Sequence, residues 1–281
     1  MILIADSGST KTDWCTVDEQ GQTKTIQSIG INPYYMNEAG IKEVLDKELI
    51  PFLNPETIKE IHYYGAGCST EQKCGLVGSI LQDSFKNAAV EVNHDMLGAA
   101  RALCDHKPGI ACILGTGSNS CSFNGKEITE NAISLGYLLG DEGSGAYLGK
   151  KLLTDYFHGR MPQNIQQFFH NEYNLSLETA LDNMYNKPKP NRYLASFSKF
   201  ISKYREEEYL KEMVLNSFDD FFRISVSKYK DYKTLDVNFL GSVAYYFSDL
   251  LRITAGKYGV TIGNIYRSPM EGLVLYHTDF Q

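Results

Sequence analysis

The chain has 281 residues, a length that suits one large or two moderate domains. Its 43% hydrophobic and 22% charged residues are ordinary for a soluble globular protein, and its net charge of −7 argues against a general nucleic-acid-binding protein, which usually carries a basic patch. No apolar run approaches the roughly 20 residues that span a bilayer, and the N-terminus shows no signal-peptide pattern, so we expect a cytoplasmic protein with neither a membrane nor a nucleic-acid partner.

The first half of the sequence alternates between predicted strands and helices, as the period of its apolar residues indicates. The predicted elements are a β-hairpin over residues 1–17, helices over residues 41–52 and 76–81, short strands over residues 58–64 and 89–92, and an alanine-rich helix over residues 96–104. Such alternation is typical of an α/β fold.

A domain boundary is predicted at residues 106–109, where His-Lys-Pro-Gly follows the alanine-rich helix. The elements predicted after it are a second hairpin over residues 110–123, a glycine-rich stretch over residues 136–149 that leads into a helix, a mostly helical region over residues 165–232, a strand over 237–240, a helix over 244–258, a strand over 260–266 and a short helix over 269–276.

The six cysteines show neither a C-x-x-C pair nor the paired spacing of a structural zinc site. They lie at positions 15, 68, 74, 104, 112 and 121. We therefore expect reduced thiols that are buried or half-buried, as is usual in the cytoplasm.

Each predicted hairpin has a Gly/Ser/Thr turn directly behind an apolar strand. In the first, residues 2–5 lead into Asp6-Ser7-Gly8-Ser9-Thr10, and in the second, residues 110–114 lead into Gly115-Thr116-Gly117-Ser118. Backbone N–H groups in such turns can form an anion-binding concavity. The repeated pattern therefore indicates a duplicated fold that holds one polyphosphate between two turns. The alternative is a pair of ordinary hairpin turns, in which Gly and Ser are common.

Neither turn matches the P-loop or the dinucleotide fingerprint. A P-loop needs a Gly-Lys pair and opens a helix, whereas Lys11 follows Thr10 and residues 13–17 are rich in strand formers. The dinucleotide fingerprint needs a third glycine where Ser120 stands, and residues 121–125 are typical of a strand and a turn. Both turns are therefore predicted to connect strands.

Several segments together resemble the actin-like sugar kinase superfamily, and within it the N-acetylglucosamine kinase and BadF/BadG/BcrA/BcrD ATPase family. The segment Asp6-x-Gly8-x-Thr10-Lys11-Thr12 with Trp14 resembles the first phosphate motif, and residues 114–118 resemble the second. Residues 139–145 (LGDEGSG) resemble a stretch particular to this family, residues 93–95 (NHD) its catalytic-aspartate segment, and Gly241-Ser242 its adenosine motif. The matches occur in family order over nearly the whole chain.

This resemblance implies a fold of two actin-like (ribonuclease H-like) α/β domains, with ATP and substrate in the cleft between them. We expect the N-terminal domain at residues 1–107, with residues 267–281 as a candidate completion of it, and the C-terminal domain at residues 108–266. The resemblance also implies ATP and Mg²⁺ as cofactors, a small-molecule sugar as substrate, and a homodimer as one candidate assembly.

For the nucleotide, the resemblance assigns Asp6 to Mg²⁺, through water. The cofactor-binding residues that it implies are Gly8, Ser9, Thr10, Lys11, Gly115, Thr116, Gly117, Gly241 and Ser242. Alternatives stay open for three of these positions: Asp6 could cap its own turn, Lys11 could be solvated, and Gly241 with Ser242 could serve strand-to-helix packing alone.

For the sugar, the resemblance makes Asp95 the catalytic base, which would orient and deprotonate the attacking hydroxyl. The implied substrate-binding residues are Asn32, Asp95, Ser118 and Asp141. Asp95 could instead be a helix N-cap, and Asn32, which precedes a proline, could serve turn chemistry. Asp141 and its neighbour Glu142 could cap the helix predicted to start near Gly143.

The function that follows is ATP-dependent phosphorylation of an amino sugar, with N-acetylglucosamine and its 6-hydroxyl as the first expectation. The chain is short for the family, which leaves the exact sugar open. One alternative is a BadF-type ATPase that acts on a partner protein, although the sequence shows no matching segment of cysteines for an iron–sulfur cluster. The other is a non-catalytic sugar or nucleotide sensor.

Overall fold

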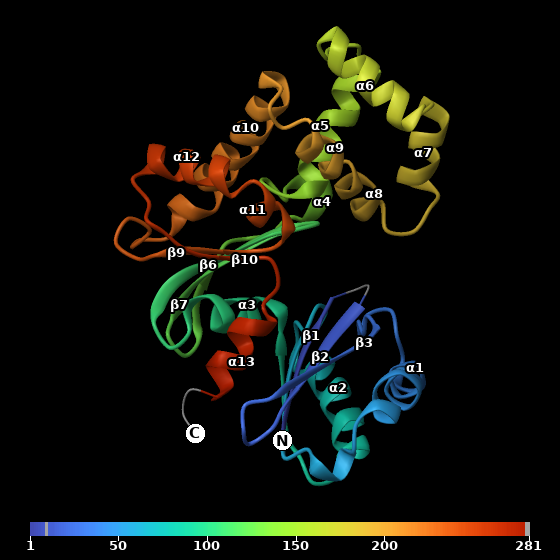
Figure 1. The fold of residues 1–281 in the computed structure, drawn as a ribbon, viewed down its shortest axis with the longest axis vertical. Helices are drawn as coiled ribbons and strands as arrows, with labels where there is room; N and C mark the ends of the chain where they lie inside the picture. Colours follow the sequence, from blue (N-terminus) through green and yellow to red (C-terminus); the bar gives the residue numbers. More distant parts are fainter. Residues whose placement is uncertain (9–10, 279–281) are drawn as a thin grey trace. The chain divides into compact units, whose positions relative to one another are not determined.

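The computed structural model describes residues 1–8 and 11–278, which divide into two compact units (Figure 1). The first unit contains residues 1–107 and 125–127 together with the segment from residue 269 onward. The second unit contains residues 108–124 and 128–268.

The first unit is built on a mixed sheet with the strand order β3-β2-β1-β4-β5. Its elements are β1 (Ile2–Ser7), β2 (Lys11–Val17), β3 (Thr23–Ile29), α1 (Glu38–Val44), the π-helical turn η1 (Leu45–Leu49), the 3₁₀ turns η2 (Ile50–Phe52) and η3 (Pro55–Thr57), β4 (Glu60–Gly65), α2 (Glu71–Ser84), β5 (Ala89–His94), α3 (Asp95–Cys104) and α13 (Met270–Thr278). β1, β2 and β3 pair antiparallel, whereas β1, β4 and β5 pair parallel.

Both faces of this sheet are covered, which explains why β1 is apolar at every position from residue 2 to residue 5. Leu3 and Ala5 face a core shared with α1 and α2, whereas Ile2 and Ile4 face a core shared with α3 and α13. Figure 1 shows α13 beside α3, and a Cβ on Gly272 would lie 2.2 Å from the Ala102 carbonyl oxygen. The C-terminal helix therefore packs backbone to backbone against α3.

The second unit repeats this topology in the strand order β10-β9-β6-β7-β8. Its elements are β6 (Pro108–Leu114), β7 (Ser118–Asn124), β8 (Ile128–Asn131), α4 (Gly136–Leu139), α5 (Gly145–Phe157), α6 (Gln163–Tyr173), α7 (Leu177–Tyr185), α8 (Pro190–Ser196), α9 (Ser198–Lys203), α10 (Glu208–Ile224), the 3₁₀ turn η4 (Val226–Lys228), β9 (Val237–Leu240), α11 (Ser242–Tyr246), α12 (Ser248–Tyr258) and β10 (Ile262–Tyr266). β6, β7 and β8 pair antiparallel, and β6, β9 and β10 pair parallel, as in the first unit. The duplication predicted from the two hairpins is thus present in the connectivity of the sheets.

Two parts of the sequence fold differently from expectation. β3 and β8 have no counterpart among the predicted elements, because their residues are mostly exposed and polar and give no apolar period. The single helix expected over residues 41–52 is α1 followed by a π-helical turn and a 3₁₀ turn, because Pro51 cannot donate the next helical hydrogen bond. Its last apolar residue, Phe52, is 54% exposed.

None of the helices in the described part of the chain combines the length and the apolar character needed to cross a membrane.

The face of the first sheet that packs against α13 holds a cluster of titratable side chains. The ring of His277 stacks on that of His62 with centroids 3.7 Å apart, and its Nε2 lies 2.8 Å from the Tyr64 hydroxyl. Arg101 donates hydrogen bonds to the Tyr64 hydroxyl and to Glu91. Burial, with added repulsion from His62 and Arg101, lowers the pKa of His277 to about 3.

This cluster predicts that acid destabilises the first unit through His277. Its pKa in the folded protein lies below the ordinary value of 6.5, so the unfolded chain takes up the proton first as the pH falls. The stabilisation is complete above pH 6.5 and is lost toward pH 3, at up to about 1.4 kcal/mol per pH unit for one proton. His277→Gln should therefore reduce the difference in urea midpoint between pH 7 and pH 5.

The fluorescence of Trp14, the only tryptophan and fully buried in the first unit, reports this unfolding. His158→Gln, at an exposed position after α5, is the matched control and should retain the wild-type pH dependence. An unchanged pH dependence in His277→Gln would contradict the assignment.

Candidate functional site

The β1–β2 turn carries the residues predicted for metal and phosphate. β1 ends at Ser7 and β2 begins at Lys11, and the Gly8 N–H donates to the Lys11 carbonyl oxygen at 3.0 Å. The turn therefore connects two strands, as predicted, and does not open a helix. Ser9 and Thr10, two of the predicted phosphate ligands, lie outside the described residues.

Asp6 is the most perturbed acid of this turn. Burial, with added repulsion from Asp13 and Asp95, raises its pKa to about 7, and the charge on Lys11 opposes that rise. Asp13 lies directly across the β1–β2 pair from Asp6. Among residues 1–8 and 11–278, no side chain or amide donates a hydrogen bond to the Asp6 carboxylate. This group therefore fits a cation that arrives with a ligand. The turn-capping alternative for Asp6 concerns amides that lie partly outside the described residues.

The residues around Asp6 fit a magnesium ion that takes most of its ligands from outside the protein. The described residues contain no cluster of three His, Cys, Asp or Glu side chains that could hold a metal ion by themselves. Magnesium, however, is usually bound through one or two carboxylates, with phosphate oxygens and water filling its other positions. Asp6 suits that arrangement, in which the nucleotide brings most of the ligands.

Lys11 is paired on the surface of the turn. Its Nζ donates to Asp13 Oδ2 at 2.6 Å, and 59% of its side chain is exposed. Gln27 donates to the other carboxylate oxygen of Asp13 at 2.7 Å. The charge of Lys11 is thus partly neutralised by Asp13 in the described structure.

Asp95 opens α3, but His94 is the N-cap of that helix. The Leu97 N–H donates to His94 Nδ1 at 3.3 Å, whereas Asp95 Oδ1 accepts from the next amide, Met96 N–H, at 2.9 Å. Desolvation by the surrounding protein raises the pKa of Asp95, although the residue remains exposed to solvent. The charge of His94 and the Met96 amide oppose that rise. The second carboxylate oxygen of Asp95 stays available for a ligand.

Asn32 takes part in a turn and also keeps a polar group for a ligand. Its Oδ1 accepts from the Tyr34 N–H at 2.9 Å, which is the turn chemistry kept open above. The described residues offer its Nδ2 no hydrogen-bond partner, which leaves a donor for a ligand. Gly67, at φ +88°, packs so closely against this side chain that only glycine fits there, because a Cβ would lie 2.4 Å from Asn32 Oδ1.

In the second unit, the β6–β7 turn is held by the start of α5. The Gly145 N–H donates to the Gly115 carbonyl oxygen at 2.8 Å, and the Ala146 N–H donates to that of Thr116 at 3.0 Å. The Gly115 N–H closes the turn on the Gly117 carbonyl oxygen at 3.0 Å. The N–H groups of Thr116 and Gly117 have no partner among the described residues, so these two donors remain for an anion.

Asp141 lies against this turn. A Cβ on Gly117 would lie 2.8 Å from Asp141 Oδ2. Burial is the main cause that raises the pKa of Asp141, and the Ser118 amide lowers it. The cap of α5 is Ser144, whose Oγ accepts from the Tyr147 N–H at 3.1 Å. The capping alternative for Asp141 therefore does not apply.

Gly241 meets the same turn from the end of β9. Its φ is +118°, and a Cβ on it would lie 2.5 Å from the Leu114 carbonyl oxygen and 3.1 Å from the Gly115 nitrogen. Ser242 follows as the exposed first residue of α11. Three segments that are distant in sequence thus converge in the second unit, at Gly115, Asp141 and Gly241.

Two cavities of the second unit differ in their relation to these residues. A small cavity of about 50 Å³ includes Ser118 and Asp141 in its lining, together with Asn119 and the apolar side chains of Ile133 and Leu135. Ile133 and Leu135 were not predicted as site residues, because neither belongs to a motif that the sequence displays.

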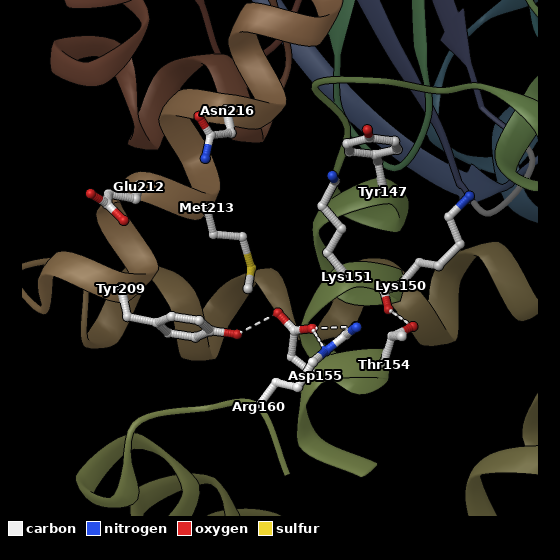
Figure 2. Close-up of a pocket in the computed structure, with 10 residues that line it drawn as sticks. All are labelled: Tyr147, Lys150, Lys151, Thr154, Asp155, Arg160, Tyr209, Glu212, Met213 and Asn216. Atoms are coloured by element: carbon white, nitrogen blue, oxygen red, sulfur yellow. Dashed lines mark hydrogen bonds and ion pairs between the residues drawn. The ribbon is translucent and has the colours of Figure 1, made fainter. Parts of the chain in front are cut away.

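A cavity of about 550 Å³, shown in Figure 2, lies between α5 and α10 and contains none of the predicted site residues. Its charged groups largely pair with one another: Arg160 and the Tyr209 hydroxyl both donate to Asp155, as Figure 2 shows. Lys151 lies 3.9 Å from Asp220. The predicted residues of the second unit therefore gather at its own β6–β7 turn and not at this larger cavity.

Neither a family model nor a curated protein matches the sequence, but solved structures do. A protein of Porphyromonas gingivalis, named provisionally as an N-acetylglucosamine kinase, is 43% identical, with 99% of each chain covered and a TM-score of 0.94. A Chromobacterium violaceum protein of the same provisional name is 16% identical over 98% of each chain, with a TM-score of 0.74. The ROK hexokinase of Thermus thermophilus is 14% identical over 98% of this chain and 97% of its own, with a TM-score of 0.56.

The two more distant likenesses concern the fold alone, and they confirm the expected architecture of two actin-like α/β domains. The Porphyromonas gingivalis protein is similar enough, over nearly the full length of both chains, to establish kinship. The chain therefore belongs to the family of actin-like sugar kinases.

Proposed function

We propose that this chain transfers the γ-phosphoryl group of ATP to an amino sugar, with the 6-hydroxyl of N-acetylglucosamine as the foremost acceptor. The observation that carries the proposal is the pair of carboxylates Asp6 and Asp95. Asp6 lies beside the β1–β2 turn, and the negative charge of Asp95 is near enough to raise the pKa of Asp6. The provisional name of the 43% identical relative supports the choice of sugar.

On the nucleotide side, Asp6 would hold Mg²⁺ through water. The bound ion supplies charge neutralisation on the β- and γ-phosphates, which phosphoryl transfer needs more than covalent help. The amides of Thr116 and Gly117 would bind phosphate oxygens, together with Gly8, Ser9, Thr10, Lys11 and Gly115. Gly241 and Ser242 would let the backbone approach the adenosine.

On the sugar side, Asp95 would orient the hydroxyl and accept its proton. As the new O–P bond forms, the bond between the γ-phosphorus and the bridging oxygen breaks, and ADP leaves with that electron pair. A raised pKa makes Asp95 a better base near neutral pH than an ordinary aspartate. Asn32, Ser118 and Asp141 would position the sugar, with Asn32 Nδ2 as a donor and the Asp141 carboxylate as an acceptor.

The first test is sugar-dependent ADP release. With Mg²⁺ and ATP, N-acetylglucosamine should stimulate ADP formation well above the rate without sugar, and N-acetylmannosamine, glucosamine and glucose serve as competing acceptors. Stimulation by none of them would exclude a sugar kinase and favour an ATPase that acts on a partner. Stimulation by glucose alone would leave the kinase proposal intact and overturn the choice of amino sugar.

The second test is Asp95→Asn, which removes the proposed base and keeps the shape of the side chain. We expect kcat to fall by about 10²–10⁴-fold. Mg·ATP should bind at least as well as to the wild type, because one charge that opposes ionisation of Asp6 is gone. Asp83→Asn, exposed on α2 and paired with Lys86, is the control with unchanged turnover. Near-normal kcat in Asp95→Asn would remove Asp95 as the base.

The third test concerns Gly241. Gly241→Ala places a methyl group against the Leu114 carbonyl oxygen at a positive φ, so the β6–β7 turn must shift. We expect the Kd for Mg·ATP to rise about tenfold or more, since small misplacements of binding groups are costly. The control is Gly256→Ala in α12, where an added Cβ meets nothing within 4 Å. Wild-type affinity in Gly241→Ala would contradict a nucleotide role for this turn.

A further inference from the structure

The hydroxyl of Ser7 joins the β1–β2 turn to the segment that carries Asn32. Ser7 is the last residue of β1 and is fully buried. Its Oγ lies 2.7 Å from Thr12 Oγ1 on β2, 3.1 Å from the Ile31 carbonyl oxygen and 3.2 Å from the Ile31 nitrogen. One hydroxyl therefore touches β2 and both polar groups of a residue 24 positions away in the sequence.

The hydrogen-bonding capacity of this hydroxyl can be fully used. A serine hydroxyl donates once and accepts twice. Donation to the Ile31 carbonyl oxygen, with acceptance from the Ile31 N–H and the Thr12 hydroxyl, satisfies all three positions. The single proton of the Thr12 hydroxyl has a second acceptor in the Ile29 carbonyl oxygen at 3.3 Å, at the end of β3, and when it points there Ser7 Oγ donates to Thr12 instead. The contact is thus a specific junction rather than an incidental approach.

The junction connects the two ligand-facing parts of the first unit. Asp6, the proposed metal carboxylate, precedes Ser7 in β1, and Asn32, a proposed sugar contact, follows Ile31. Asn32 is 9% exposed and is held on its other side by Gly67. Fixing Ile31 to Ser7 therefore fixes the distance between the metal side and the sugar side of the unit.

We propose that Ser7 is a positioning residue that sets the place of Asn32, and hence of the sugar, relative to the Asp6 carboxylate. This inference rests on the proposed function. Ser7 itself touches neither ligand in this account, since its side chain is fully buried. Without its hydroxyl, the Ile31 N–H and the Thr12 hydroxyl lose a buried partner, and the segment that carries Asn32 becomes free to shift.

The test is Ser7→Ala, compared with Ser28→Ala as the matched control. Ser28 is also buried, on strand β3 at the other side of β2, and its hydroxyl accepts from Trp14 Nε1 at 2.9 Å without bonding the Ile31 backbone. Both variants lose one buried hydroxyl and should lose similar thermal stability. Only Ser7→Ala should raise the KM for the sugar, by about tenfold or more, with the KM for ATP within about twofold of wild type.

Hydrogen exchange of the ligand-free protein gives a readout that does not depend on turnover. Amides in residues 30–36 should exchange faster in Ser7→Ala than in the wild type, and not in Ser28→Ala. Thr12→Val removes the second hydroxyl of the network from β2 and should change the sugar KM in the same direction, which keeps the test open if Ser7→Ala does not fold.

The outcomes separate the two proposals. Absence of sugar-dependent turnover in the wild type contradicts the proposed function, and a sugar role for Ser7 falls with it. If the wild type is active but Ser7→Ala and Thr12→Val keep its sugar KM and its exchange rates at residues 30–36, the positioning role of Ser7 is overturned and the kinase proposal stands. Equal KM changes in Ser7→Ala and Ser28→Ala would indicate a general loss of stability and would likewise overturn it.

Discussion

An uncompensated carboxylate determines the chemistry of the first unit. Asp6 is half-buried beside Asp13, with the charge of Asp95 within reach, and these effects together bring its pKa to about 7. Such a group must either carry a proton or meet a cation. Among residues 1–8 and 11–278, only Lys11 opposes the rise in pKa, and its ammonium is already shared with Asp13. The proposal that this carboxylate meets the magnesium ion of a nucleotide rests on that imbalance of charge.

The two units share one sheet topology, but the turns behind their first strands are supported differently. In each, a buried first strand ends in a short turn to an antiparallel second strand. The β1–β2 turn is supported by side-chain hydroxyls at Ser7 and Thr12 and stands beside carboxylates. The β6–β7 turn is supported by amides of α5 and by the close approach of Gly241, which leaves its own N–H groups for an anion. One turn thus suits the metal of a nucleotide, and the other suits its phosphates.

The sequence predicts those parts of the fold that repeat a local pattern. Buried apolar runs mark β1, β6 and β9, and glycines mark the turns behind them, because both signals lie within a few neighbouring residues. β3 carries mostly exposed polar side chains and gives no such signal. Contacts between distant residues have no local pattern at all. Neither the bond of Ser7 to Ile31 nor the approach of Gly241 to Leu114 could be read from spacing, although the glycine itself was predicted.

The central claim is that Asp6 ionises when the magnesium nucleotide binds. Calorimetric titration of a preformed complex of Mg²⁺ with a non-hydrolysable ATP analogue, in two buffers of different ionisation enthalpy, measures the protons released. A pKa of about 7 predicts release of about 0.9 proton at pH 6 and about 0.1 at pH 8, with affinity that weakens below pH 7. Release at pH 6 should disappear in Asp6→Asn. Proton release near zero at pH 6 in the wild type, with affinity independent of pH, would contradict the account.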